Sequence, residues 1–493
     1  MVSDFFYPNM GGVESHLYEL SQRLIQRGHK VVIITHAYGR RTGVRYLTNG
    51  LKVYYVPTQV IYAEATLPTI YGFFPLFRHI VIRESIQIVH GHGAFSSLCH
   101  EAILHSKTMG LKAVFTDHSL FGFADASSIL TNKLLKFTLS DIDHVICVSH
   151  TSKENTVLRA ALSPRHVSVI PNAVVASQFL PDPTRPDPNY ITIVVISRLV
   201  YRKGVDLLIA IIPRICEMYK QVRFIIGGDG PKRIDLEQMR EKHLLHERVK
   251  LLGPIKHHEV RNVLIQGNIF LNTSLTEAFC IAIVEAACAG LFVVSTKVGG
   301  VPEVLPSHMI NYASPEEDDL VIAVSKAIHK LRFGKVDPSK FNDELKEMYN
   351  WSNVAERTEK VYASVYQTRN SPLIERLRRY YGCGLYAGKI FCMLMALDYL
   401  IWKYLEWVFP TDAIEVADTF PYQRYRHVDI DSLSSSSNRN STYKEYQVED
   451  ACVNNCANTH LNNSSPTSAI YMLDDDSNKV LSDAIIVEEE EEE

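Results

Sequence analysis

Paired cysteines, a strong charge bias and an apolar leader are all missing from this sequence. Its nine cysteines show no disulfide spacing, and Cys147, Cys280 and Cys288 lie in apolar runs. This usage is typical of reduced thiols that face the cytosol. The 51 basic and 55 acidic residues nearly balance, so the composition indicates no nucleic-acid partner. The opening "MVSDFFYPNMGG" predicts the end of a strand running into a glycine turn, not a secretory signal peptide.

Apolar residues alternate between helical and strand spacing through the first third of the chain. One helical face, which ends at Gly28 before the strand "KVVIITHA", is formed by Val13, Leu17, Leu20 and Leu24. Further apolar runs, separated by segments of helix length, continue this alternation. Such a pattern predicts a parallel sheet with helices on both faces. We therefore predict a Rossmann-like domain over residues 1–175.

A segment rich in proline and aspartate separates this domain from a second one. The stretch "PDPTRPDPNY" has little to bury and predicts a linker, which we place at 176–190. A second strand and helix series predicts a Rossmann-like domain over 191–345, and we expect a helix within 346–372 to pack back on the first domain. The predicted fold class is therefore α/β, with two doubly wound domains facing a cleft. Such a cleft is the natural ligand site.

The character of the chain changes after residue 372. An apolar stretch at 384–408 is about long enough to cross a bilayer. Asp398 near its middle would cost roughly 2.5 to 3.5 kcal/mol on insertion scales, and Lys389 adds to that cost. Two interpretations stay open. The stretch is either a membrane segment helped by a partner or by a tilted or re-entrant pose, or an amphipathic helix packed on the soluble body.

The charges around this stretch predict its orientation. Basic residues precede it, namely Arg376, Arg378 and Arg379, whereas the charges that follow it are acidic, namely Asp412, Glu415 and Asp418. The positive-inside rule then places the two large domains in the cytosol. Residues 411–493, rich in serine and asparagine and closed by a run of glutamates, have the composition of a disordered tail.

Candidate binding residues follow successive strands of the second domain. Arg198 and Lys203, in "SRLVYRKG", come after its first strand, where an open α/β sheet receives its ligand. Two cations there suit a diphosphate, although two solvated surface residues without a ligand would give the same sequence pattern. Gly228 and Gly230, in "GGDGP", let the backbone approach a ligand or simply make a tight turn. With "VGGVPE" (298–303) after another strand, these features indicate one shared site.

The stretch "EAFCIAIVEAACAG" carries two glutamates eight positions apart, Glu277 and Glu285. A spacing of eight rotates about 80° around a helix, so the two cannot share one narrow face. The capping residues at 272–276 place Glu277 in an entry loop and Glu285 in the second helical turn. A buried carboxylate needs a partner. The candidates are an internal arginine or lysine and a ligand hydroxyl.

The first domain contributes a glycine pair and a histidine to the predicted cleft. Gly11 and Gly12, at the start of the first helix, offer backbone N–H groups and a positive dipole end to an anion. "FTDHS" places Asp117 and His118 at a strand end on the cleft side. A lone histidine is more often structural, so its position rather than its type makes His118 a candidate.

Together these motifs resemble those of the retaining family 4 glycosyltransferases of GT-B fold. The similarity is carried by the glycine pair, "SRLVYRKG", "GGDGP" and the two spaced glutamates. The strings "TDHSLFGFAD", "ICVSHTSKENTVLRAAL", "VSVIPNAV", "FLNTSLTEAF" and "NVAERTEKVY" are similar to a narrower family, the catalytic subunits of phosphatidylinositol N-acetylglucosaminyltransferases of PIG-A type. The resemblance covers residues 1–370 and the apolar stretch.

The resemblance implies transfer of N-acetylglucosamine from UDP-GlcNAc to phosphatidylinositol with retention of configuration, the first step of glycosylphosphatidylinositol anchor synthesis. It implies an endoplasmic reticulum membrane protein with cytoplasmic catalytic domains, other membrane subunits as partners, and neither a metal nor a cofactor. Two alternatives stay open: a related lipid-directed transferase with another nucleotide-sugar donor, and a non-catalytic scaffold of the same fold.

The resemblance also implies residue roles. Glu285 would bind the ribose hydroxyls, while Arg198 and Lys203 would hold the diphosphate. The transferred sugar would contact Glu277 and the amides of Ala278, Phe279 and Cys280, with Gly228 and Gly230 also on the donor side. The acceptor would meet Gly11, Gly12 and His118, and chemistry would involve His118, Arg198, Lys203 and Glu277. We favour same-face attack by an inositol hydroxyl, because no free carboxylate is evident on the first-domain side to act as a nucleophile.

Overall fold

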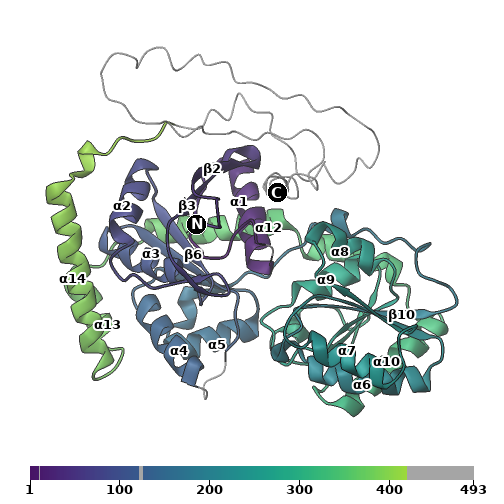
Figure 1. Ribbon diagram of the computed structural model, residues 1–493. Helices are drawn as coiled ribbons and strands as arrows, with labels where there is room; N and C mark the ends of the chain where they lie inside the picture. Colours follow the sequence, from purple (N-terminus) through teal and green to yellow (C-terminus); the bar gives the residue numbers. More distant parts are fainter. Residues whose placement is uncertain (10, 122–125, 419–493) are drawn as a thin grey trace, which may run out of the picture.

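The computed structural model describes residues 1–9, 11–121 and 126–418, which form two α/β units side by side (Figure 1). The N-terminal unit contains strands β1 (Val32–His36), β2 (Gly43–Leu47), β3 (Leu51–Val56), β6 (Ile88–His92), β7 (Lys112–Asp117), β8 (His144–Cys147) and β9 (Val167–Val169). Their orders are β1-β3-β2 and β6-β7-β8-β9, and the pairing is parallel except between β2 and β3. Val2 bridges to both Ile34 and Gly91, so it joins the two groups of strands.

Helices cover both faces of this sheet. They are α1 (Gly12–Gln26), α2 (Phe74–Arg83), α3 (Ser97–Thr108), α4 (Ala126–Leu139) and α5 (His150–Ala160), with a small ribbon of β4 (Val60–Tyr62) and β5 (Ala65–Thr66) before α2. The predicted apolar face of α1 is confirmed, because Leu17, Leu20 and Leu24 are buried. Phe115 of β7 is also fully buried, in a cluster between the sheet and the helices beside it.

The C-terminal unit has six parallel strands in the order β12-β11-β10-β13-β14-β15. They are β10 (Ile191–Ile196), β11 (Val222–Gly227), β12 (Val249–Gly253), β13 (Ile269–Asn272), β14 (Phe292–Thr296) and β15 (Ile310–Ala313). The helices between them are α6 (Val205–Met218), α7 (Arg233–Lys242), α8 (His257–Leu264) and α9 (Ile281–Cys288), and α10 (Glu317–Arg332) follows β15. The strand order reverses between β10 and β13, and ligands bind at the carboxyl ends beside such a switch point.

The connection between the units is partly buried. Ala176 and Phe179 lie in the core, because the short 3₁₀ helix Ala176–Phe179 packs on α9. Asn342 of α11 (Phe341–Met348) donates to the carbonyl oxygens of both residues, at 3.0 and 3.1 Å. The expected linker of 176–190 is therefore free of helix and strand only after Phe179. Apolar side chains tie its first part to the C-terminal unit.

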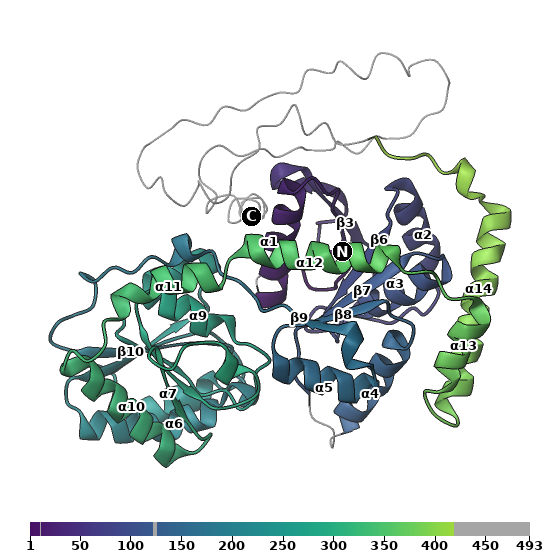
Figure 2. The same ribbon diagram turned by 180° about the vertical axis from the view of Figure 1, so that it is seen from behind.

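The chain returns to the N-terminal unit through α12 (Trp351–Gln367). Figure 2 shows this helix running from the C-terminal unit across the back of the N-terminal one. It packs on α1, and the Tyr362 hydroxyl lies 2.7 Å from Nδ1 of His90 in β6. Trp351, at its first turn, contacts the His16 ring with centroids 5.3 Å apart. One helix therefore joins the two units.

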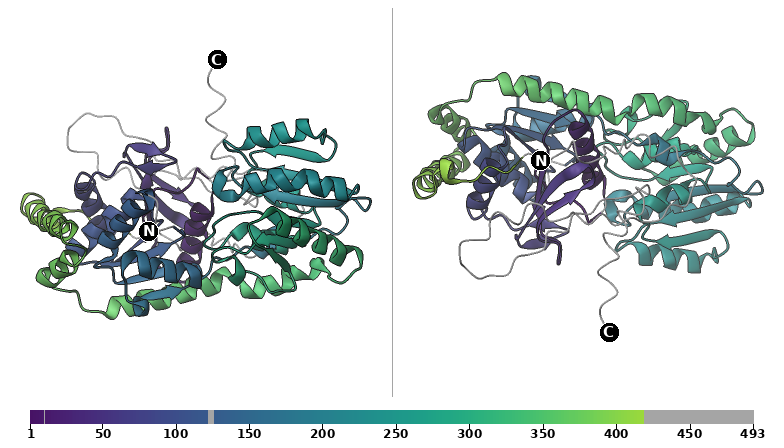
Figure 3. Two further views of the ribbon diagram at one scale, coloured as in Figure 1. Left: turned by 90° about the horizontal axis from the view of Figure 1, so that it is seen from below. Right: turned by 90° about the horizontal axis from the view of Figure 1, so that it is seen from above.

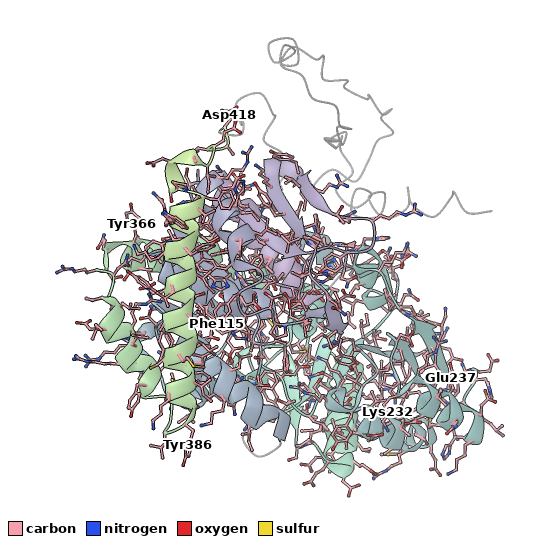
Figure 4. The ribbon with its side chains drawn as sticks, turned by 60° about the vertical axis from the view of Figure 1, so that its left-hand side comes forward. Phe115, Lys232, Glu237, Tyr366, Tyr386 and Asp418 are labelled. Carbon is pink, nitrogen blue, oxygen red and sulfur yellow. The ribbon has the colours of Figure 1, made fainter. Side chains whose placement is uncertain are left out.

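Two further helices, α13 (Leu373–Tyr381) and α14 (Ala387–Val408), lie on the side of the N-terminal unit away from the C-terminal unit (Figure 3). In Figure 4, α14 runs along that side, with Tyr386 at its start. Asp398 is buried against α3, where its Oδ1 lies 2.8 Å from Nδ1 of His105, and Glu406 binds Arg78 of α2 at 2.7 Å. In the part of the chain that the structure describes, no helix has both the length and the apolarity needed to cross a bilayer.

Packing on the body also accounts for most of the basic cluster before this helix. Arg376 Nε and Arg379 Nη1 bind the two carboxylate oxygens of Asp141, at 2.6 and 2.5 Å. The arginines that we interpreted as a topological flank are thus largely internal partners of the segment between α4 and β8. The outer face of α14 has the opposite character, because it exposes Ile390, Met393, Leu397, Leu400, Tyr404 and Trp407.

Candidate active site between the two domains

A glycine turn after β10 brings Lys203 to the loop after β13. The turn Tyr201–Lys203 ends at Gly204, whose φ of 65° lies in the left-handed region. A Cβ at this position would lie 1.8 Å from the Thr273 carbonyl oxygen, so no side chain fits. The Thr273 hydroxyl in turn donates to the Lys203 carbonyl oxygen at 3.0 Å. The two loops at the switch point are therefore held together by the Thr273 hydroxyl and by the Leu275 N–H, which donates to the Arg202 carbonyl oxygen at 2.9 Å.

Lys203 and Glu277, which the sequence assigned to different parts of a ligand, form an ion pair. Lys203 Nζ donates to Glu277 Oε1, which also accepts from the Ser274 hydroxyl at 2.8 Å. Their side chains are only 25% and 12% exposed, so the pair is largely removed from water. Burial opposes the charged form of Lys203, but Glu277 outweighs it and the pKa of Lys203 is raised. The pair is a preorganised polar element at the carboxyl ends of β10 and β13.

Arg198 lies on the same loop, and its charge acts on Glu14 at the start of α1 in the other domain. Burial raises the pKa of Glu14 in the first turn of α1, and the positive charge of Arg198 partly offsets this rise. Gly11 precedes that turn, and a Cβ there would lie 2.5 Å from Glu14 Oε2. At Gly12 a Cβ would meet no atom within 4 Å. The Glu14 carboxylate thus lies against Gly11 and takes hydrogen bonds from the backbone of Val13 and Glu14, so of the glycine pair only Gly12 borders open space.

Gly228 and Gly230 support the loop that carries Arg198. Their φ angles are 125° and 150°, which only glycine adopts readily. A Cβ on Gly228 would lie 1.9 Å from the Ser197 carbonyl oxygen, and one on Gly230 would lie 2.5 Å from that of Leu199. Of the two interpretations of "GGDGP", the tight backbone turn accounts for both glycines. Gly228 and Gly230 would therefore influence ligand binding indirectly, by holding the loop that carries Arg198.

Glu285 has a partner that we did not predict. As expected, Glu277 precedes α9 and Glu285 lies in its second turn. The internal partner is neither arginine nor lysine, because Glu285 Oε1 lies 3.7 Å from Nε2 of His257 at the start of α8. The nearby carboxylate of Glu285 raises the pKa of His257, against the effect of burial. Nothing in "IKHHEV" distinguishes His257 from a surface residue, since the contact depends on how α8 and α9 pack.

His118 is one of several imidazoles gathered under the cleft. Its Nε2 lies 3.3 Å from Nδ1 of His92 at the end of β6, and its ring contacts that of His16 with centroids 4.7 Å apart. Burial, assisted by the charge of His90, lowers the pKa of His118 to about 3. At neutral pH it is therefore an uncharged group that can donate or accept a hydrogen bond. The string "HGHG" at a strand end was a signal for His92 that our sequence analysis passed over.

The neighbouring Asp117 turns away from the cleft. Its Oδ2 accepts from Thr156 at 2.8 Å and lies 3.4 Å from Nη1 of Arg159, both in α5. Among the described residues, the only group with metal-ligating geometry is His16, His92 and His118, with one nitrogen from each within 4.8 Å of the others. The expectation that no metal takes part stays a prediction.

Comparison with known proteins identifies glycosyltransferase families. Residues 36–125 match the family described as PIGA (GPI anchor biosynthesis), and residues 177–332 match the family described as glycosyl transferases group 1. The chain is 19% identical to sucrose-phosphate synthase from Thermosynechococcus elongatus, with a TM-score of 0.61 over 72% of this chain and 94% of that one. It is 17% identical to Anabaena HepE in complex with UDP-glucose, with a TM-score of 0.59 over 74% and 98%. These structures show that the fold is GT-B.

Closer relatives narrow the family. The chain is 63% identical to the phosphatidylinositol N-acetylglucosaminyltransferase gpi3 subunit of Schizosaccharomyces pombe, over 85% of this chain and 91% of the relative. It is 58% identical to a phosphatidylinositol N-acetylglucosaminyltransferase subunit of Homo sapiens, over 85% and 86%. Identity of this level across both domains makes the chain a member of the PIG-A (GPI3) family of phosphatidylinositol N-acetylglucosaminyltransferases, which are glycosyltransferases of GT-B fold.

Proposed function

We propose that this chain transfers N-acetylglucosamine from UDP-GlcNAc to phosphatidylinositol, with retention of configuration. The observation that carries the proposal is the convergence of Arg198, Lys203, Glu277 and Glu285 at the carboxyl ends of β10 and β13, opposite the start of α1. The family membership supports the acceptor and the sugar. Two alternatives are less favoured because of this membership. They are a transferase with a donor other than UDP-GlcNAc and a scaffold without activity.

The charges of the site suit departure of a nucleoside diphosphate. Lys203 and Arg198 would stabilise the negative charge that develops on the leaving phosphate oxygen, because preorganised cations in a partly dry cleft act strongly on such charge. We propose that these two cations serve in place of a metal and that the reaction needs none. Glu277, fixed by Lys203 and Ser274, would hold the sugar, and Glu285 would accept from the ribose hydroxyls.

The first domain would present the acceptor. We propose that the inositol hydroxyl attacks on the face from which UDP departs and that the departing phosphate oxygen takes its proton. A neutral His118 would orient the reacting sugar or the attacking hydroxyl through a hydrogen bond. At the start of α1, where the Glu14 carboxylate already bonds to the first backbone N–H groups, the open space at Gly12 would let the acceptor approach the backbone.

The assay that tests the reaction uses microsomes that contain the chain with its partner subunits. Labelled UDP-GlcNAc and UDP-glucose are supplied separately, and the lipid product is identified by mass. We expect label from UDP-GlcNAc in N-acetylglucosaminyl phosphatidylinositol and at least about tenfold less from UDP-glucose, since a site built to bond the acetamido group leaves polar atoms unpaired with glucose. Equal transfer from both donors would refute the assignment of the sugar.

We further propose that residues 384–408 attach the catalytic domains to the cytoplasmic face of the endoplasmic reticulum membrane, together with other membrane subunits. The support is the arrangement of α14, whose acidic groups Asp398 and Glu406 face the protein while a stripe of large apolar side chains, together with Lys389 and Lys403, is exposed. Protease treatment of sealed microsomes tests this orientation. A tag at residue 1 should be digested; its protection would contradict the cytoplasmic placement. A tag after residue 493 is protected if the segment spans and digested if it lies on the surface.

A further inference from the structure

The motif "VGGVPE" at 298–303 ends in a glutamate that reaches the other domain. Glu303 Oε2 accepts from the backbone N–H of His150 at 2.6 Å, and Oε1 accepts from the N–H and the hydroxyl of Thr151 at 2.8 and 2.7 Å. His150 and Thr151 are the first residues of α5. A carboxylate is well placed there, because the start of a helix has unpaired N–H groups and a positive dipole end. These hydrogen bonds lower the pKa of Glu303, against the effect of burial.

Ser149, the residue before α5, makes a second contact across the same boundary. Its hydroxyl donates to the Ala278 carbonyl oxygen at 2.7 Å and accepts from the backbone N–H of Ser152 at 3.0 Å. Ser149 is buried, so both bonds lie out of water. Ala278 belongs to the loop between β13 and α9 that follows Glu277. A hydroxyl of the first domain therefore anchors the loop to which the proposed function assigns the transferred sugar.

The two glycines of the motif allow these elements to stack. A Cβ on Gly299 would lie 2.1 Å from the Glu277 carbonyl oxygen, and one on Gly300 would lie 2.0 Å from that of Ala278 and 2.6 Å from the Ser149 hydroxyl. The Gly300 N–H donates to the Glu277 carbonyl oxygen at 3.0 Å. The loop that follows Glu277 is thus enclosed between its own domain and α5, and neither Gly299 nor Gly300 has room for a side chain.

A matching contact lies on the Lys203 side of the cleft. Arg202 Nη2 donates to the Leu120 carbonyl oxygen at 3.1 Å, and its guanidinium lies 5.7 Å from the ring centroid of Phe121. Leu120 and Phe121 follow His118. The two domains therefore meet at two places: where Glu303 binds α5, and where the loop of His118 contacts the loop of Lys203.

We propose that Ser149 and Glu303 are positioning residues that couple domain closure to assembly of the sugar site. We call Ser149, Thr151 and Glu303 the interdomain clasp. When the domains close, the clasp fixes the loop Glu277–Cys280 in the form that holds the sugar; when they open, the exposed Glu303 is solvated again and the loop is released. The proposal rests on the proposed function for the identity of the ligand in that loop. Neither residue touches the reacting atoms.

The clasp proposal predicts lower turnover at unchanged UDP affinity. A purely structural role of Ser149 and Glu303 does not predict this combination. The proposed function places the ribose and diphosphate contacts on the C-terminal domain, so Glu303→Gln and Ser149→Ala should leave UDP affinity within about threefold of wild type. Turnover should fall by roughly tenfold to a hundredfold, because misplacement of a reacting group by about 1 Å has effects of that size. Glu317→Gln, which alters an exposed ion pair with Arg214 in the same domain, is the matched control and should match wild type in both.

The experiment uses the full chain with its copurifying subunits in detergent. UDP affinity and turnover with UDP-GlcNAc are measured for the single variants and for Glu303→Gln combined with Thr151→Val, which should be no worse than Glu303→Gln alone. Fluorophores on the two domains report closure: UDP-GlcNAc, whose sugar the proposed function places near His118 of the first domain, should shorten their distance in wild type and shorten it less in Glu303→Gln. Wild-type turnover in both single variants, or lost UDP affinity with unchanged turnover, would overturn the clasp.

The two proposals fail separately. If UDP-GlcNAc closes the domains in a manner that depends on Glu303 but is not turned over, the clasp stands and the proposed reaction is wrong. If UDP-GlcNAc is turned over and neither clasp variant changes the rate, the reaction stands and the clasp is wrong.

Discussion

Replacement of Lys203 by methionine separates the structural and the chemical contributions of the Lys203–Glu277 pair. Methionine keeps the length and much of the volume of lysine but removes the charge. Glu277 would then be left at 12% exposure with the Ser274 hydroxyl as its remaining hydrogen-bond partner among those described above. Removing one partner of a fully buried ion pair destabilises a protein by about 3 to 5 kcal/mol. Because Lys203 is 25% exposed, water screens part of this effect, and we expect about 2 to 3 kcal/mol.

The double variant Lys203→Met with Glu277→Gln removes both charges and should recover most of that stability. A glutamine can still accept from Ser274, and no uncompensated carboxylate is buried. Turnover should not recover. We expect about a hundredfold loss or more in Lys203→Met, in Glu277→Gln and in the double variant, equivalent to roughly 2.7 kcal/mol of transition-state stabilisation.

Urea unfolding of the purified chain measures stability, and transfer from UDP-GlcNAc in the assembled complex measures turnover. Lys232→Met provides the control, because Lys232 forms ion pairs with Asp206 and Asp235 on the surface of the same domain and should be replaceable with little effect on either quantity. Unchanged stability in Lys203→Met would mean that the pair does not hold the loops. Turnover within twofold of wild type would mean that Lys203 does not contact the leaving group.

Three further predictions follow from other parts of the site. Arg198→Ala should lower turnover by about a hundredfold without changing the unfolding midpoint, because the side chain is exposed; wild-type turnover would remove it from the diphosphate site. Glu285→Gln should weaken UDP binding and return the pKa of His257 toward 6.5, measured by NMR of the ring. Because the folded pKa of His257 is raised, the stability from this pair is complete below about pH 6.5 and is lost as the pH rises through the folded pKa, so wild type but not the variant should lose stability there. Turnover should be unchanged by EDTA or by a zinc-selective chelator; a loss restored by one added metal would point to the group of His16, His92 and His118.

Residues at strand ends were predictable, because parallel strands bring their carboxyl ends to one edge whatever the details of packing. Lys203, Glu277 and Glu285 were found in this way, and their positions in a loop or a helical turn followed from spacing and capping residues. The sequence does not show, however, that Lys203 and Glu277 bind each other. That contact needs the close approach of two loops at Gly204, which depends on the register of β10 beside β13.

Contacts between distant segments were not predictable from local pattern. His257 meets Glu285 only because α8 packs beside α9. Asp398, which we counted as a cost for membrane insertion, is instead paired with His105 almost three hundred positions earlier in the chain. Arg376 and Arg379 were interpreted as a flank of a membrane segment, yet they satisfy Asp141. The sequence alone does not show whether water, lipid or an opposite charge surrounds a charged side chain.

The outer face of α14 has a consequence for handling the protein. Its large exposed side chains, Ile390, Met393, Leu397, Leu400, Tyr404 and Trp407, recur at intervals of three and four and form one stripe along the helix. Water wets such a stripe poorly, so two isolated chains would gain free energy by bringing their stripes together. In the absence of lipid, detergent or partner subunits, concentration of the purified chain would therefore lead to association through a surface remote from the cleft. Turnover and the extent of self-association would then vary independently in the same preparation.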